Sequence, residues 1–126
     1  MAELCVRRVY ETDPKHDPTT DGTRVLVDRL WPRGLARDAA RIDHWMRGVA
    51  PSDELRRWFG HDPARWLEFQ ACYHAELRAS MHPDLARLRA LAQGQGRVTL
   101  LFAARDDTHN NALALKTFLE QEHAEG

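Results

Sequence analysis

Several residues and motifs that often reveal a protein's chemistry are scarce in this chain of 126 residues. It holds only two cysteines, Cys5 and Cys72, which are too far apart in sequence for a zinc ribbon or a thioredoxin-like redox motif. We therefore expect both to be reduced, buried thiols. No two histidines are spaced as H-x-x-x-H or H-E-x-x-H, which argues against a histidine-based zinc site.

The familiar phosphate-binding and hydrolase motifs are also missing. There is no G-x-G-x-x-G, no G-x-x-x-x-G-K-[ST] and no G-x-S-x-G, so dinucleotide binding, P-loop chemistry and a serine nucleophile elbow lose support. The glycine-rich QGQGR at Gln93–Arg97 precedes a strand. Loops that cradle phosphate follow a strand and open a helix, so QGQGR is interpreted as a connector.

Long apolar runs and a strong charge of one sign are absent as well. No stretch approaches the ~20 apolar residues that span a bilayer, and no apolar segment follows a basic start, so we expect a cytoplasmic protein without membrane contact. The net charge of −1 does not favour nucleic acid as a partner. Length and composition predict one α/β domain over residues 1–126.

Lysine is rare, because sixteen of the eighteen basic residues are arginine. Arginine binds phosphate and carboxylate groups through its planar fork, whereas codon bias in a GC-rich genome would raise arginine content without any function. We attribute the total to codon bias and assign function only to local clusters of arginine.

Three short segments rich in β-branched and apolar residues predict strands, at Leu4–Tyr10, Thr23–Leu30 and Arg97–Ala103. The last two are almost continuously apolar, as in parallel strands that are covered on both faces. Between the first two lies Glu11–Gly22, whose prolines and terminal Asp-Gly predict a loop.

Helical spacing takes over between the second and third strands. The apolar residues Ile42, Trp45, Met46 and Val49 predict one helix. Further helices are expected after the caps Ser52 and Asp62, between Pro83 and Gly94, and from about Thr108 to Glu122 with Asp107 or Thr108 as cap. This order predicts an α/β fold with a small, mostly parallel sheet of three or more strands and helices on both faces, in a reduced Rossmann-like arrangement.

Ligands of open α/β sheets bind outside the carboxyl ends of the strands. That rule selects DRLWPRG at positions 28 to 34 after the second strand, and Arg105–Asn111 after the third. If these strands are neighbours, both clusters share one crevice. The helix connection WFGHDP, from Trp58 to Pro63, is a third candidate.

Asp28 and Asp106 are the candidate carboxylates for general acid and base chemistry, and the two together could instead hold a divalent cation. The structural alternatives are that Asp28 pairs with an arginine and that Asp106 caps the last helix. His61, in the turn between two predicted helices, is the third catalytic candidate as a proton shuttle. It is equally well explained as a surface turn histidine.

Arg29 and Arg33 flank Trp31, an arrangement that grips a phosphate, a carboxylate or a stacked base. The alternative is that Trp31 covers the sheet end while the arginines bond to loop carbonyls. The predicted substrate-binding residues are Arg29, Trp31, Arg33, Trp58 and Asn110.

The three segments DGTRVLVDRLWPRG, APSDELRRWFGHDPARWLEF and VTLLFAARDDTHNNALAL together resemble the YeaO-like group of the family known as domain of unknown function 488, from about Arg8 to Leu119. The resemblance implies a small cytoplasmic bacterial or archaeal α/β protein and carries no established activity. Its motif-bearing positions are Asp28, Arg29, Trp31, Pro32, Arg33, Trp58, His61, Asp62, Asp106 and Asn110. Longer members of the family carry cysteine and histidine where AARDDTHNN stands here, and this departure argues against a cysteine-dependent reaction.

Three functions remain open at this point. The first is an acid-base hydrolase or transferase acting on a small phosphorylated or nucleotide-like substrate. The second is a non-catalytic module that binds a nucleotide or nucleic acid, and the third is a structural or partner-binding protein. No cofactor is predicted apart from the open alternative of a divalent cation, and the sequence leaves the oligomeric state undetermined.

Overall fold

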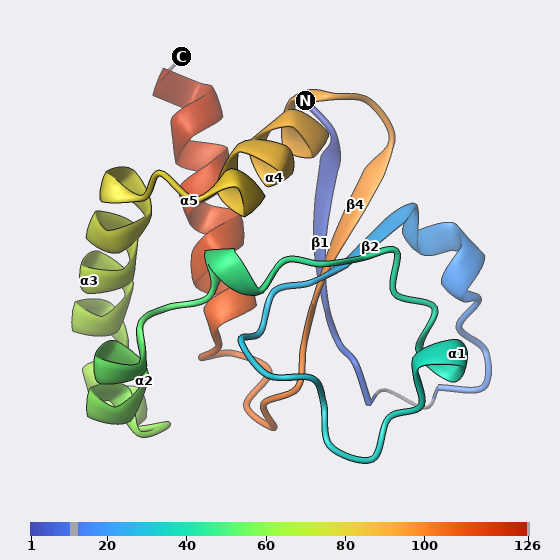
Figure 1. The fold of residues 1–126 in the computed structure, drawn as a ribbon, viewed down its shortest axis with the longest axis horizontal. Helices are drawn as coiled ribbons and strands as arrows, with labels where there is room; N and C mark the ends of the chain where they lie inside the picture. Colours follow the sequence, from blue (N-terminus) through green and yellow to red (C-terminus); the bar gives the residue numbers. More distant parts are fainter. Residues whose placement is uncertain (11–12, 126) are drawn as a thin grey trace.

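The computed structural model describes residues 1–10 and 13–125 and contains one four-stranded parallel sheet with the strand order β1-β4-β2-β3 (Figure 1). The strands are β1 (Glu3–Arg8), β2 (Thr23–Leu26), β3 (His44–Trp45) and β4 (Arg97–Phe102). The predicted α/β class with a small parallel sheet is confirmed. Because β2 and β4 are neighbours, the two polar segments that follow them leave the sheet side by side.

Within residues 1–10 and 13–125, five α-helices and three 3-10 turns surround the sheet. The helices are α1 (Arg37–Ala40), α2 (Asp53–Phe59), α3 (Trp66–Ala79), α4 (Pro83–Gln93) and α5 (Asn111–Glu125), and the turns are η1 (Pro18–Asp21), η2 (Arg47–Val49) and η3 (Pro63–Arg65). Figure 1 shows α2 to α5 on one side of the sheet and η1 and α1 on the other. Leu100 packs in the core with the long helices, while Leu26 and Leu101 are fully buried on the opposite face. Alternation along β4 therefore fills both faces, as its apolar sequence predicts.

The helix boundaries follow the predicted caps in most places. The Ser52 hydroxyl accepts a hydrogen bond from the Leu55 amide at 3.2 Å, and Gly60 ends α2 in the left-handed conformation. The Asp62 carboxylate accepts from the Ala64 amide at 3.0 Å and opens the turn that leads into α3. Pro83 is the first residue of α4, as expected.

The predicted helix over Ile42–Val49 is wrong. The backbone pairs with β2 instead, since the Asp43 amide donates to the Arg24 carbonyl and the Met46 amide donates to the Leu26 carbonyl, both at 2.9 Å. The apolar spacing of three and four arises because a short strand and a 3-10 turn bury different residues in succession. The sequence pattern of such a strand-turn pair is indistinguishable from that of a helix.

Two smaller expectations also need correction. Both cysteines were expected to be buried, but Cys5 is only half-buried and Cys72 is exposed on the outer face of α3. The last helix begins at Asn111 instead of about Thr108, because Asn110 caps it and its side chain accepts from the Leu113 amide at 3.0 Å. Positions 11 and 12 of the predicted loop lie outside the described residues.

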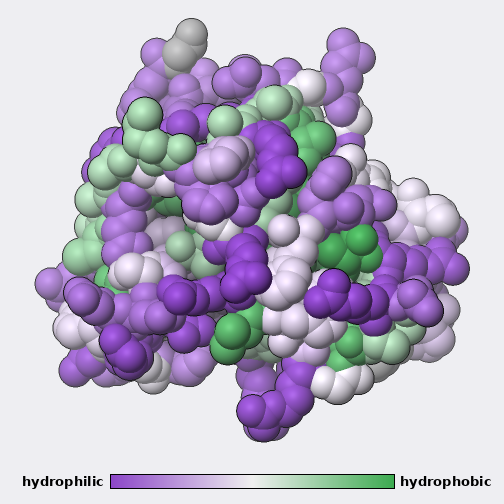
Figure 2. Space-filling view, viewed as in Figure 1, coloured by the Kyte–Doolittle hydropathy of each residue, from purple (hydrophilic) through white to green (hydrophobic). Residues whose placement is uncertain are grey.

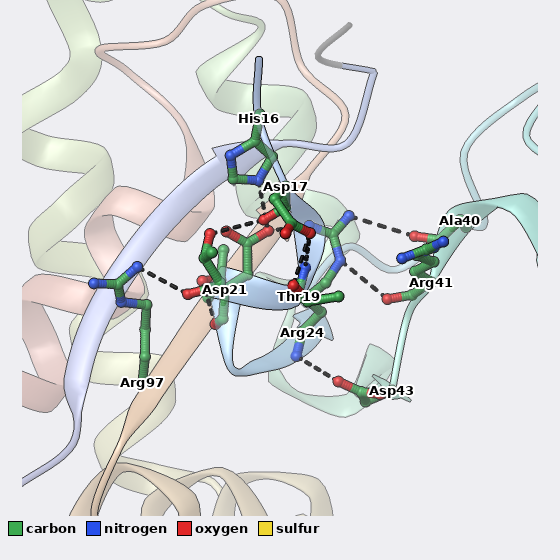
Figure 3. A network of polar contacts seen from close by, with 11 residues as sticks. His16, Asp17, Thr19, Asp21, Arg24, Ala40, Arg41, Asp43 and Arg97 are labelled. Atoms are coloured by element: carbon green, nitrogen blue, oxygen red, sulfur yellow. Dashed lines mark hydrogen bonds and ion pairs between the residues drawn. The ribbon is translucent and has the colours of Figure 1, made fainter. Parts of the chain in front are cut away.

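A polar network around buried Asp21 fastens the loop that precedes β2 to the amino end of this strand (Figure 3). The Asp21 carboxylate contacts Arg24 and the ring of His16, and the Arg24 guanidinium also donates to the Arg41 carbonyl at 3.0 Å. Gly22 is required here, because it has a φ of 66° and a Cβ would lie 2.1 Å from the Arg97 carbonyl oxygen. These contacts fix the loop at the amino end of β2.

No helix within the described ranges, 1–10 and 13–125, is long and apolar enough to cross a membrane. Charged and polar residues cover most of the molecular face in Figure 2, interrupted by small separate apolar areas.

Leu100 is predicted to contribute strongly to stability because it has no exposed surface, whereas Leu67 on α3 is 80% exposed. Leu100→Ala should lower the free energy of unfolding by about 2–5 kcal/mol, and Leu67→Ala should change it by less than about 0.5 kcal/mol. Urea denaturation measures both. Equal losses for the two variants would contradict the described core.

Candidate functional site

The site begins where β2 and β4 end. The last backbone hydrogen bond between them is donated by the Val27 amide to the Leu101 carbonyl at 3.1 Å. The side chain of the next residue, Asp28, then takes over, because its Oδ2 accepts from the Ala103 amide at 2.9 Å. Asp28 thus joins the two strand ends after the backbones have diverged.

The second Asp28 oxygen connects the sheet to α5. The Asn111 side-chain amide donates to Oδ1 of Asp28 at 3.1 Å and to the Val27 carbonyl at 3.2 Å. Burial raises the pKa of Asp28 above its ordinary value, although the hydrogen bonds from Asn111 and Ala103 oppose the shift. Within the described residues no arginine, lysine or histidine forms an ion pair with this carboxylate, so the predicted alternative of an Asp28–arginine pair is not what the structure contains.

A pocket of about 1000 Å³ opens at this end of the sheet. Seven of the eight predicted site residues line it, namely Asp28, Arg29, Trp31, Arg33, His61, Asp106 and Asn110. Trp58 is the exception: its ring lies under the guanidinium of Arg65, outside the pocket lining. The apolar part of the pocket wall is formed by Ala50, Pro51, Phe59 and Phe69.

Five arginines line the pocket against two aspartates. Arg29 pairs with Asp53 at 3.0 Å, and Arg8 donates to the Ala104 carbonyl at 3.0 Å. Arg33 and Arg105 are exposed, and neither forms an ion pair with any residue that the structure describes. No described carboxylate therefore neutralises Arg33 or Arg105 through an ion pair.

Trp31 is held in place by its neighbours. Its indole N–H donates to the Leu35 carbonyl at 2.8 Å, and the ring packs edge-on against Trp45 with 5.5 Å between centroids. The Arg37 guanidinium lies over the Trp31 ring, 4.8 Å from its centroid. Trp45 in turn donates to the Asp28 carbonyl at 2.9 Å, so the whole loop after β2 is tied to the strand end.

Asp106 organises the turn that follows β4. Its Oδ1 accepts from the Thr108 and His109 amides at 2.9 and 3.0 Å, and its Oδ2 lies 2.9 Å from Nδ1 of His109. The Thr108 amide is the main cause that lowers the pKa of Asp106 to about 2. The turn therefore favours the ionised form of Asp106 and places its carboxylate against the His109 ring.

The remaining candidates have simpler environments. His61 is exposed at the pocket edge, with a φ of 57°, in the turn after Gly60. Asn110 is 2% exposed and donates to the Asp106 carbonyl at 3.0 Å while it caps α5. The described residues contain no cluster of three or more histidine, cysteine, aspartate or glutamate side chains arranged as metal ligands.

Arg8, Arg105 and His109 line the pocket but were not among the predicted site residues. Arg105 and His109 lie in the Arg105–Asn111 segment that was selected as a whole, and the spacing of three residues between Asp106 and His109 was the available signal for the histidine. Arg8 is the last residue of β1, so the rule that sites lie at strand ends would have selected it once β1 was placed beside β4.

Comparison with known proteins agrees with the motifs found in the sequence. The model of a family described as the inactive DUF488-N3 subclade matches residues 3–126. The chain belongs to this family. It is 44% identical over 115 residues to an uncharacterised protein of Mycobacterium tuberculosis, a match that covers 90% of this chain and 91% of the relative. The uncharacterised Escherichia coli protein YeaO is 40% identical over 113 residues, covering 90% and 93%. No solved structure matches the chain.

The two pocket aspartates are predicted to titrate in opposite directions. Carboxyl-carbon NMR should find that Asp28 titrates above the ordinary aspartate pKa of 3.8 and that Asp106 titrates near 2. Since folding favours the ionised form of Asp106, its contribution to stability is present above pH 3.8 and is lost as the pH falls toward 2. Equal pKa values for the two groups, or a lower pKa for Asp28 than for Asp106, would contradict the geometry.

Proposed function

We propose that the pocket at the strand ends binds a small anionic ligand that carries a flat, nucleotide-like group, and that the protein is a binding module and not an acid-base enzyme. The observation that carries the proposal is the excess of arginine over aspartate in the lining, with Arg33 and Arg105 outside any described ion pair. Guanidinium groups bind phosphate and carboxylate through paired hydrogen bonds.

The surroundings of the arginines support the same ligand class. The apolar wall residues and Tyr10 provide a surface against which a flat group of the ligand can pack. The volume of about 1000 Å³ is at the upper end of the range of small-molecule sites.

Two observations favour binding over catalysis. The lowered pKa of Asp106 argues against it as the second member of the predicted acid-base pair, because an efficient general acid or base titrates near the working pH. The family that the chain matches is also described as inactive. Asp28 alone retains a raised pKa, and its hydrogen bonds to Ala103 and Asn111 give it a bridging role in the fold.

A calorimetric titration with inorganic pyrophosphate and nucleoside monophosphates tests the proposal. Arg33→Ala and Arg105→Ala should each weaken binding roughly 10- to 150-fold, the equivalent of one lost hydrogen bond to a charged group. Arg78→Ala on α3 is the matched control, since this arginine is exposed and lies outside the pocket lining. Its affinity should equal that of the wild type.

Failure of every anion to bind would overturn the proposal. If the wild-type protein converts a bound ligand and Asp28→Ala loses this turnover, the protein is an acid-base enzyme and not a binding module. Affinity that rises with oligonucleotide length and falls steeply with salt would instead identify a nucleic acid module, because each neutralised phosphate releases a counterion.

A further inference from the structure

The proposed anion site leaves the Asp28 carboxylate without a function toward the ligand. Asp28 lines the pocket where β2, β4 and α5 meet, and its two oxygens accept from the Ala103 amide and the Asn111 side chain. Arg33 and Arg105 line the same pocket and are exposed. The lining therefore offers a carboxylate as well as guanidinium groups.

Asp28 can accept more hydrogen bonds than the protein supplies. A carboxylate offers about four acceptor positions, and within the described residues each Asp28 oxygen receives one donor, from Ala103 or from Asn111. An anionic group placed here would be repelled. A ligand that fills the inner pocket must therefore present hydrogen-bond donors to this carboxylate, because a buried acceptor without a donor is costly.

The two carboxylate oxygens favour a flat group with two parallel N–H donors. Guanine presents its ring N1–H and its 2-amino group side by side on one edge, which matches a carboxylate in a bidentate arrangement. Adenine presents an acceptor nitrogen next to its amino group, and hypoxanthine lacks the 2-amino group. A site that hydrogen-bonds one such edge rejects analogues that leave its acceptors unpaired.

We propose that the pocket is selective for guanine nucleotides, with the Asp28 carboxylate accepting from the base edge and Arg33 and Arg105 holding the phosphate. This inference rests on the proposed function and adds the identity of the base to it. Asp28 keeps its bridge to Ala103 and Asn111 while it binds, because the base occupies the remaining acceptor positions.

Titration of the wild-type protein with the 5′-monophosphates of guanosine, inosine and adenosine tests the selectivity without any mutation. Guanosine monophosphate should bind at least roughly tenfold more tightly than inosine monophosphate, and adenosine monophosphate should bind most weakly. Equal affinities that still depend on Arg33 would overturn guanine selectivity and leave the anion site intact. No binding of any of the three, or of pyrophosphate, would overturn both.

The variant Asp28→Asn tests the direction of the hydrogen bonds. An asparagine amide presents one acceptor and one donor, so it matches the N1–H and 2-carbonyl of xanthine. The preference should change from guanosine to xanthosine monophosphate, which a purely structural role for Asp28 would not produce. Asp38→Asn, at an exposed aspartate of α1 outside the pocket lining, should leave the base preference unchanged.

Thermal unfolding establishes whether Asp28→Asn is folded. A folded variant that binds neither base better than the other contradicts the proposal. If the variant fails to fold, the wild-type nucleotide series decides alone.

Discussion

The carboxylate of Asp28 holds together the end of the molecule at which β2, β4 and α5 meet. Its two oxygens accept from the Ala103 amide and the Asn111 side chain, so one side chain replaces the backbone pairing that ends at Val27. The divergence of the chain beyond this point creates the pocket. Burial among the three elements also explains why the pKa of Asp28 is raised while its position is fixed.

The rest of the site follows from what this bridge positions. The loop after β2 carries Trp31 and Arg33 along one pocket wall, and the turn after β4 carries Arg105 and Asp106 along another. At the amino end of β2, the polar side chains around Asp21 are bonded to one another. The pocket instead combines arginines outside described ion pairs with a carboxylate whose oxygens each receive one described donor. That combination supports the proposed ligand, which has an anionic part and a donor-bearing part.

The sequence predicted the features that depend on local pattern. Continuous apolar residues around Leu100 and Leu101 identified a doubly covered strand, and the polar residues after it identified one wall of the pocket. It could not predict β3, because two paired residues followed by a 3-10 turn have the apolar spacing of a helix. Nor could it assign the role of Asp28, whose partner amide is 75 positions away at Ala103. Nor could it predict that the Thr108 and His109 amides would donate to the Asp106 carboxylate and lower its pKa, because these bonds depend on the backbone conformation of the turn.

In the proposed complex, Asp28 both braces the strand ends and receives the ligand, and NMR chemical-shift mapping tests this double role most directly. On saturation with guanosine 5′-monophosphate, the largest shifts should occur at the Ala103 backbone amide and the Asn111 side-chain amide, because both donate to the carboxylate that the base contacts. If both signals stay unmoved when the protein is saturated with the nucleotide, and the shifts are confined to other surfaces, Asp28 does not receive the ligand.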